Sequence, residues 1–370
     1  MPRMILNRVW LLALVPRVPA LLAQDAPATP LPKIGVDPYG SLRATLGVGE
    51  GGNMEIVNKL SRLGVNLDAP LWEGFSAFAK YEAGINLVDQ NPTLDFSGGD
   101  DNPAAGKGSQ AVTTRLGFLG FKGAFGTVAI GKQWSVYYDI GEWTDRFNQV
   151  GGQASGTYNA GTDGGISGTG RPENALIYRP PAWGPLEFGL QVQLRNRTSG
   201  DVSGADTYGA SVRWTITKLL TVGFAGNVVR DGVENPGPLE PKAGDRAAIL
   251  GIKLQDTDRW TLSLTGGRSK AHEVDNTGTY FDAAWSELYG SYRFQPRWAA
   301  YLVYNDLRPT GDDYPGQYRK SYAAGGVQWT LPLQGGKSYC FLEAKLDHGQ
   351  SDLGVATHGT AVGFGLRLTF

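Results

Sequence analysis

Hydrophobic and polar positions alternate with a period of two along much of this chain. The pattern is clearest at the end of the sequence, where every even position from Val362 to Phe370 is apolar and the odd positions between them are small or polar. Residues 186–195, 208–216 and 260–265 repeat it. A period of two places successive side chains on opposite faces of a strand, so one face of each segment meets an apolar medium and the other a polar one.

The alternating segments predict an all-β chain with about sixteen strands. An even number of strands is what a closed antiparallel barrel needs, and no fixed-length repeat indicates a solenoid or propeller. The predicted strands are 39–49, 57–68, 73–87, 112–122, 126–134, 172–180, 184–196, 206–216, 219–230, 244–255, 258–269, 279–294, 297–307, 319–331, 336–347 and 359–370.

The lengths of the connections carry a second signal. Every second link is short, such as 217–218 and 295–296, whereas most of the others are long and polar, such as 88–111 and 135–171. Short periplasmic turns and longer external loops are typical of outer-membrane barrels. The sequence therefore predicts a transmembrane antiparallel β-barrel over residues 39–370. A soluble β-propeller is the structural alternative.

Composition narrows the classes further. The longest uninterrupted apolar run, Val9 to Val15, is far shorter than the roughly 20 residues that a spanning helix needs. The single cysteine, Cys340, excludes an intrachain disulfide and any multi-cysteine metal site. The three histidines, His272, His348 and His358, fall in segments predicted to be loops or loop edges. We expect no metal site and no cofactor.

Residues 1–23 resemble a secretory signal peptide. Arg3 and Arg8 precede a short hydrophobic stretch, and Ala20-Leu21-Leu22-Ala23 offers a cleavage site. Cleavage there removes three positive charges, including Arg17, from a chain of net charge −1 and leaves −4. Nothing in that balance indicates a nucleic-acid partner. Residues 24–38, which contain four prolines between 26 and 38, are predicted to be a linker that enters the barrel.

One stretch is more specific than the strand pattern. Thr114 to Lys122 reads TRLGFLGFK, and Phe125 to Trp134 reads FGTVAIGKQW; a Tyr-Asp pair, Thr144-Asp145 and Gly151-Gly152 follow. This arrangement resembles the general trimeric sixteen-stranded porins of Gram-negative bacteria. Ser61-Arg62-Leu63-Gly64 and the residues around Glu173-Asn174 resemble further strands of that family.

The resemblance implies a pore whose third external loop, here within 135–170, folds into the lumen. Acidic loop residues then face a basic ladder on the wall, and the facing charges set a transverse field that screens solutes. Asp145 matches the first acidic loop position, whereas Gln149 occupies the second, which weakens the negative side. The expected constriction residues are Arg43, Arg62, Lys132, Asp139, Glu142, Asp145, Gln149, Arg171 and Arg179.

Some of these residues have a second interpretation. Asp139 and Glu142 are also placed to pin the loop to the wall, and an inward arginine is often only a solvated or ion-paired lumen residue. Lys132 has the same parity as Val128 and Ile130, so a bulge at Gly131 is needed to turn it inward.

The resemblance implies passive diffusion of ions and small hydrophilic solutes across the outer membrane, with weak selectivity tilted toward anions. It also implies a homotrimer, contacts with lipid and lipopolysaccharide, and recognition of Phe370 by the barrel-assembly machinery. A substrate-specific channel and an adhesin or structural barrel are the alternatives. An enzyme is disfavoured, because no nucleophile and base motif surrounds any serine.

Overall fold

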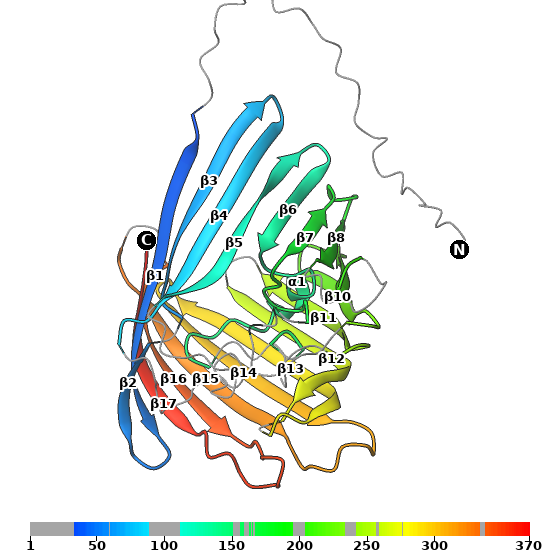
Figure 1. Ribbon diagram of the computed structural model, residues 1–370. Coiled ribbons are helices and arrows are strands. Elements are labelled where there is room, and N and C mark those ends of the chain that lie inside the picture. The colour runs from blue at the N-terminus through cyan, green and yellow to red at the C-terminus, as the bar shows by residue number, and fades with distance from the viewer. Residues whose placement is uncertain are drawn as a thin grey trace, which may run out of the picture. The chain divides into compact units, whose positions relative to one another are not determined.

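In the described part of the chain, seventeen strand segments form one antiparallel sheet that closes on itself (Figure 1). One short helix interrupts the series. The elements are β1 (Gly35–Gly49), β2 (Met54–Asn58), β3 (Arg62–Trp72), β4 (Phe75–Ile85), β5 (Val112–Gly123), β6 (Gly126–Lys132), α1 (Tyr138–Gly141), β7 (Ala175–Arg179), β8 (Leu186–Gln193), β9 (Thr207–Thr215), β10 (Leu220–Val229), β11 (Arg246–Asp256), β12 (Trp260–Val274), β13 (Tyr280–Gln295), β14 (Trp298–Pro309), β15 (Lys320–Thr330), β16 (Tyr339–Asp347) and β17 (Ala361–Thr369).

The computed structural model describes most of the barrel and its short links. The described residues are 33–58, 60–88, 112–150, 156–158, 163, 165, 167–194, 204–233, 242–256, 259–275, 277–333 and 337–370. The predicted signal peptide at 1–23 and most of the predicted linker lie outside them.

β2 and β3 are two parts of one barrel strand. Both pair with β1, from Ala44↔Asn58 to Val48↔Met54 and from Gly35↔Asp68 to Ser41↔Arg62. Leu60, between the two parts, has a φ of 57°, a left-handed conformation that interrupts the ladder. Counted as one, they give sixteen strands, which confirms the predicted fold.

The first and last strands close the barrel. β1 pairs with β17 in unbroken register from Ser41↔Thr369 to Gly49↔Ala361. Beyond the ladder, Phe370 and Gly40 exchange two backbone hydrogen bonds of 2.9 and 3.1 Å. A Cβ on Gly40 would lie 2.5 Å from the Phe370 ring, so only glycine leaves room for that aromatic side chain.

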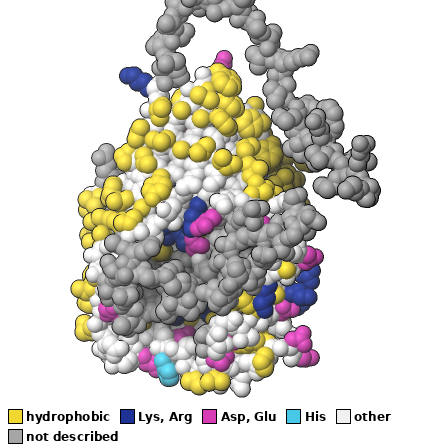
Figure 2. Space-filling view, viewed as in Figure 1, with side chains coloured by type: hydrophobic (Ala, Val, Ile, Leu, Met, Phe, Trp, Pro, Cys, Tyr) yellow, Lys and Arg dark blue, Asp and Glu magenta, His cyan; other side chains and the backbone are white. Residues whose placement is uncertain are grey.

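The two faces of the sheet differ as the alternation predicts. Large apolar side chains such as Phe224, Leu250 and Phe364 are about half exposed on the outer face. Figure 2 shows hydrophobic side chains gathered over the part of the surface where Figure 1 places β3 to β6. Inward positions between them carry polar residues such as Thr265 and Asn305. An apolar band outside and a polar inside are what a membrane barrel requires.

Two boundaries differ from the prediction. β1 begins at Gly35, so the last four residues of the predicted linker belong to the barrel. β12 extends to Val274, which places His272 inside a strand and not in a loop. No helix in the described part of the chain is long and apolar enough to cross a membrane.

Candidate pore constriction

The link between β6 and β7 packs against the inner face of the wall. Ile140 and Trp143 have no exposed surface. A Cβ on Gly251 would lie 2.7 Å from Ile140 Cγ2 and 2.8 Å from the Trp143 ring. The neighbour Leu250 is exposed on the outer face, so Gly251 faces inward. Because Gly251 and Gly223 have no side chains, the loop lies directly on β10 and β11.

Two buried wall carboxylates bind the loop. Glu343 in β16 accepts the backbone N–H groups of Asn148 and Gln149 at 2.9 and 2.7 Å. Glu287 in β13 accepts the hydroxyl of Thr144 at 2.7 Å. Sequence analysis selected neither glutamate, because each is a single acid at an inward strand position with no motif around it. Only the fold shows which loop atoms they meet.

Aromatic contacts continue this attachment. Phe147 packs edge to face on Tyr301 and Tyr289, with ring centroids 4.9 and 6.1 Å apart. The Tyr301 hydroxyl donates to Glu343 Oε1 at 2.8 Å. Such pairs add roughly 0.5–1.5 kcal/mol beyond area burial. The loop is therefore fixed over β13 to β16 by packing as well as by hydrogen bonds.

A buried histidine makes a further attachment. His272 Nδ1 lies 2.7 Å from the Asp245 carboxylate, and Nε2 lies 2.8 Å from the carbonyl oxygen of Gly156. The neighbouring Glu273 accepts the N–H of Gly156 at 3.1 Å. Burial raises the pKa of the Asp245 carboxyl, while His272 opposes that shift. The group holds the second half of the loop against β12.

Asp139 pins α1 to the wall. Its carboxylate accepts Arg179 NH2 at 2.9 Å and Arg179 Nε at 3.3 Å, and the Ser211 hydroxyl at 3.2 Å. Arg179 lies on β7 and Ser211 on β9. The two predicted constriction residues Asp139 and Arg179 thus come together, in the pinning role that was the alternative for Asp139.

Asp145 is held by aromatic hydroxyls. Tyr138 and Tyr158 both donate to its Oδ2 at 2.8 Å. Trp134 stacks on Tyr138 with ring centroids 3.9 Å apart. Burial, together with the Asp145 charge, raises the pKa of Tyr138 well above its usual value. Tyr138 therefore stays neutral and acts as a donor.

The returning part of the loop is closed by ion pairs. Asp163 Oδ2 lies 3.0 Å from Lys132 Nζ and 3.6 Å from Arg171 Nε. Burial alone would raise the pKa of Asp163, but Arg171 and Lys132 outweigh it and lower the pKa. Arg171 is buried over the Trp134 ring. It therefore does not face Asp145 across an open passage, as predicted, because Trp134 and Tyr138 lie between them.

Lys132 turns inward by a different route from the one predicted. The register of β6 with β5 and β7 runs through Gly131 without a shift, so there is no bulge there. Instead Gly131 has a φ of 126°, and a Cβ would collide with the carbonyl oxygen of Gly117. This backbone conformation is open to glycine, and Lys132 beyond it reaches Asp163.

Gln149 does not line the passage. Its side chain has no exposed surface, and neither amide atom has a hydrogen-bond partner among the described residues. The motif match located the position but not which side of the loop faces water. The expected weakening of the negative side of the field therefore cannot come from Gln149.

A basic group on the wall, here called the wall cluster, comprises Arg43, Arg62, Arg115, Arg367 and Glu82. Arg115 Nε lies 2.9 Å and Arg62 NH1 3.7 Å from Glu82 Oε1. Arg43 and Arg367 are opposite each other across β1 and β17. Both donate from Nε to Ser41 Oγ, at 3.2 and 3.1 Å. Four cations therefore meet one acid.

Arg115 reaches this cluster through a bulge. The pairing of β4 with β5 shifts between Glu82↔Leu116 and Ala83↔Thr114, which leaves Arg115 as the extra residue. A bulge re-aims one side chain of a strand. Sequence analysis placed the irregularity at Gly131, one strand later, because strict alternation gives no sign of an extra residue.

Two further charges lie beside α1. Burial raises the pKa of Glu142, Asp139 adds to that shift, and Arg146 opposes it. Arg146 is exposed, and Lys253 of β11 places its Nζ 5.1 Å from the centre of the Trp143 ring. Arg146 and Lys253 were not selected from the sequence.

Comparison with known proteins gives a consistent result. A family model described as Gram-negative porin matches residues 13–249. Outer membrane protein F of Serratia marcescens is 33% identical over 132 residues, which are 34% of each chain. The chain thus matches only about a third of that relative's length. Omp-EA of Erwinia amylovora is 26% identical over 294 residues, 74% of this chain and 67% of that protein.

Solved structures share the fold. OmpF of Salmonella typhi, solved with daunomycin, superposes with a TM-score of 0.69 over 90% of this chain and 97% of its own, at 16% identity. An anion-selective porin from Comamonas acidovorans gives a TM-score of 0.61 over 91% and 100%, at 15% identity. Since the family model covers well over half of the sequence, the chain belongs to the Gram-negative porin family.

Proposed function

We propose that this protein forms a water-filled channel in the outer membrane of a Gram-negative bacterium, through which ions and small hydrophilic solutes diffuse passively. The observation that carries the proposal is a closed barrel, apolar outside and polar inside, with a loop anchored on its inner wall. An ion crossing a low-dielectric layer needs a polar, hydrated path, which the lumen supplies. We assign the protein no enzymatic activity.

The charges on the inner wall support a weak preference for anions. The wall cluster has a formal charge of +3, and the acids of the loop are partly neutralised. Asp139 pairs with Arg179, and Asp163 pairs with Lys132 and Arg171. Positive potential in a narrow passage raises the local concentration of anions. The loop narrows the lumen beside this wall.

Planar-bilayer recording of the purified protein tests both proposals. We expect stepwise, ohmic conductance and a small zero-current potential of anion-selective sign in a KCl gradient. Folded protein that produces no conductance steps would exclude a channel. Strong cation selectivity would leave the channel standing and refute the preference for anions.

The same family membership supports three partners. We propose a homotrimer, lipopolysaccharide around the outward apolar face, and the barrel-assembly machinery as the agent of insertion. Chemical crosslinking in intact outer membranes tests the first, with a ladder that stops at three chains as the expected result.

A further inference from the structure

We propose that the inner wall holds a binding site for sugar acids, that is, for small polyhydroxylated carboxylates. The site lies near the short turn between β11 and β12 and extends across β13 to β15. As a station on a diffusion path it rests on the proposed channel function, but binding itself can be measured without conductance.

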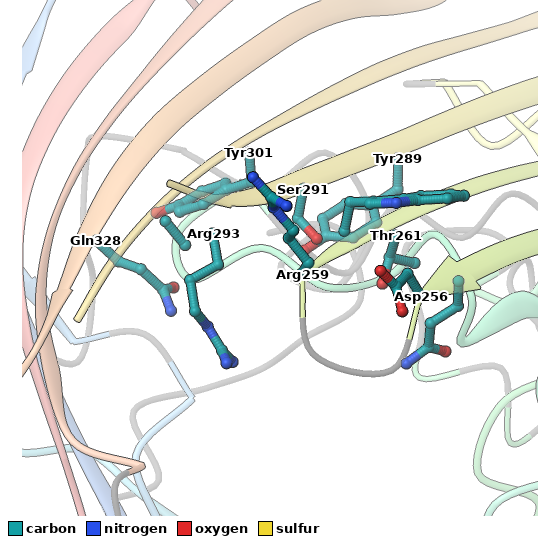
Figure 3. Close-up of a pocket in the computed structure, with 11 residues that line it drawn as sticks. Asp256, Arg259, Thr261, Tyr289, Ser291, Arg293, Tyr301 and Gln328 are labelled. Carbon is teal, nitrogen blue, oxygen red and sulfur yellow. The ribbon is translucent and has the colours of Figure 1, made fainter. Parts of the chain in front are cut away.

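The site is a cavity of about 220 Å³. A water molecule takes up about 30 Å³ in the liquid, so this volume corresponds to about seven waters and suits one sugar-sized solute. Figure 3 shows the side chains that line it. They are Gln255, Asp256, Arg259, Trp260, Thr261, Tyr289, Ser291, Arg293, Ala299, Tyr301 and Gln328.

Arg293 supplies the recognition of a carboxylate. Its guanidinium has no hydrogen bond or ion pair with the described residues, and it is exposed. Arg259 is instead engaged by the Tyr292 hydroxyl at 3.1 Å and by the face of that ring. Arg293, Ala299 and Gln328 are register partners on three adjacent strands. The small Ala299 side chain leaves room for a carboxylate between the guanidinium fork and the Gln328 amide.

The other end of the cavity favours hydroxyl groups. Gln255 and Thr261 are register partners on β11 and β12, and Asp256 follows Gln255. Asp256 accepts hydrogen bonds from hydroxyls but repels a second carboxylate. Arg293 lies two strands from β11, about 10 Å at the usual strand spacing of 4.8 Å. A ligand that bridges both ends carries its negative charge at one end only.

The tyrosines form a fixed upper edge. In Figure 3, Tyr301, Ser291 and Tyr289 lie along one side of the cavity, with Arg293 and Gln328 beside them. Phe147 of the loop packs on both tyrosine rings, so their positions are set by the constriction itself. A rigid aromatic surface beside hydrogen-bonding groups is suited to the C–H face of a sugar ring.

Other solute classes match this lining less well. A neutral sugar leaves Arg293 unpaired. Phosphate brings a second negative charge toward Asp256. An amino acid uses Arg293 and Asp256 but leaves the neutral groups Gln255, Thr261 and Gln328 without partners. Unpaired polar groups in a binding site cost affinity, so the sugar acid is preferred.

The test uses D-glucuronate, with D-glucose and 4-aminobutyrate at equal concentrations for comparison. Ligand-detected NMR on the full-length protein in detergent measures binding, and current block in planar bilayers measures access. We expect saturable glucuronate binding in about the millimolar range, since a channel must also release its solute. Arg293→Gln should weaken it about tenfold or more, the loss of one charge-assisted hydrogen-bonded pair. Arg268→Gln, on the outer face of β12, is the matched control and should not change it.

The possible results separate the two proposals. Open channels that bind glucuronate no better than glucose, or equally well in Arg293→Gln, overturn the site and leave the channel function intact. Tighter binding of 4-aminobutyrate overturns the assignment to sugar acids. Glucuronate binding that depends on Arg293, in a protein without conductance, supports the site and overturns the proposed function. Gln328→Leu is a second variant that keeps the arginine; it should weaken glucuronate more than chloride.

Discussion

At the scale of single residues, Arg62 is the most direct handle on selectivity. Its side chain is 21% exposed, against 9% for Arg115, so it is the more open to ions of the two arginines paired with Glu82. Arg62→Glu lowers the formal charge of the wall cluster from +3 to +1. A charge 4 Å from an ion in water is worth about 1 kcal/mol, roughly a fivefold effect. We expect the anion-to-cation permeability ratio to fall about two- to fivefold.

The measurement for Arg62 is the zero-current potential in a KCl gradient. Arg268→Glu makes the same charge change on the outer face and should leave the potential unchanged. An equal shift in both variants would mean that total charge, and not the position of Arg62, sets the selectivity.

Gln149 gives a second prediction at this scale. Because both amide atoms are buried without partners, Gln149→Met removes two unsatisfied groups at similar volume. It should be neutral or stabilise the folded barrel by about 1 kcal/mol. Gln149→Glu places a second carboxylate next to Glu343 and should loosen the loop. Thermal unfolding followed by heat-modified gel mobility checks the order methionine, wild type, glutamate; a glutamate variant as stable as wild type would contradict it.

Some residues could be predicted from the sequence and others could not. Arg62, Asp139 and Arg179 were found because motif and parity agree at those positions. Glu343 and Glu287 were missed because their role depends on backbone N–H and hydroxyl groups of a loop more than 140 positions away. No local pattern records such a contact.

At the scale of elements, the fit between α1 and the wall depends on missing side chains. Gly251→Val puts atoms where Ile140 and Trp143 now lie, and overpacking of this kind costs about 1–3 kcal/mol. We expect α1 to move off the wall, with altered single-channel conductance and a lower unfolding temperature. Gly325→Ala is the control, since its Cβ would meet only Tyr301 O at an ordinary 3.5 Å. Unchanged conductance in Gly251→Val would show that α1 does not border the passage.

The loop also predicts a dependence on pH. The pKa of Glu142 is raised, so this group loses its negative charge as pH falls, above the usual glutamate value of about 4.3. Asp163 has a lowered pKa, so its ion pairs stabilise the loop above about pH 3.9 and are lost only in stronger acid. From pH 7 to 5 the loop therefore stays closed while the lumen gains positive charge.

We expect the preference for anions to rise over that pH range. Glu142→Gln should show the higher preference already at pH 7 and a smaller change with pH. Reversal potentials at several pH values provide the measurement. An identical pH response in wild type and Glu142→Gln would assign the titration to another group.

Strand positions were more predictable than loop contacts. Lipid on one side and water on the other impose alternation on nearly every strand, so strand limits could be read to within a few residues. The irregular points were hidden: the break at Leu60, the bulge at Arg115 and the left-handed Gly131 each act over one or two residues. A period counted over eight or more residues averages them out.

At the scale of the whole molecule, Phe370 is predicted to matter for assembly. Its backbone extends the closing pair to Gly40 and its ring is 66% exposed, outside the barrel. Deleting Phe370 should lower the membrane-inserted, heat-modifiable fraction in cells. Phe364→Leu, which keeps an apolar outward residue in the same strand, is the control. Full insertion of the deleted protein would refute the role of Phe370.

Closure of the barrel also constrains the order of folding. Thr45 and Gly365 are direct partners although 320 positions separate them. The entropy lost in bringing such distant segments together is not repaid until the final ladder forms, so this step is expected to be slow. Until then β1 and the most recently paired strand both present open edges, which recruit other chains. The protein therefore has to be shielded from self-association through most of its assembly, and the two edges disappear together in the last step.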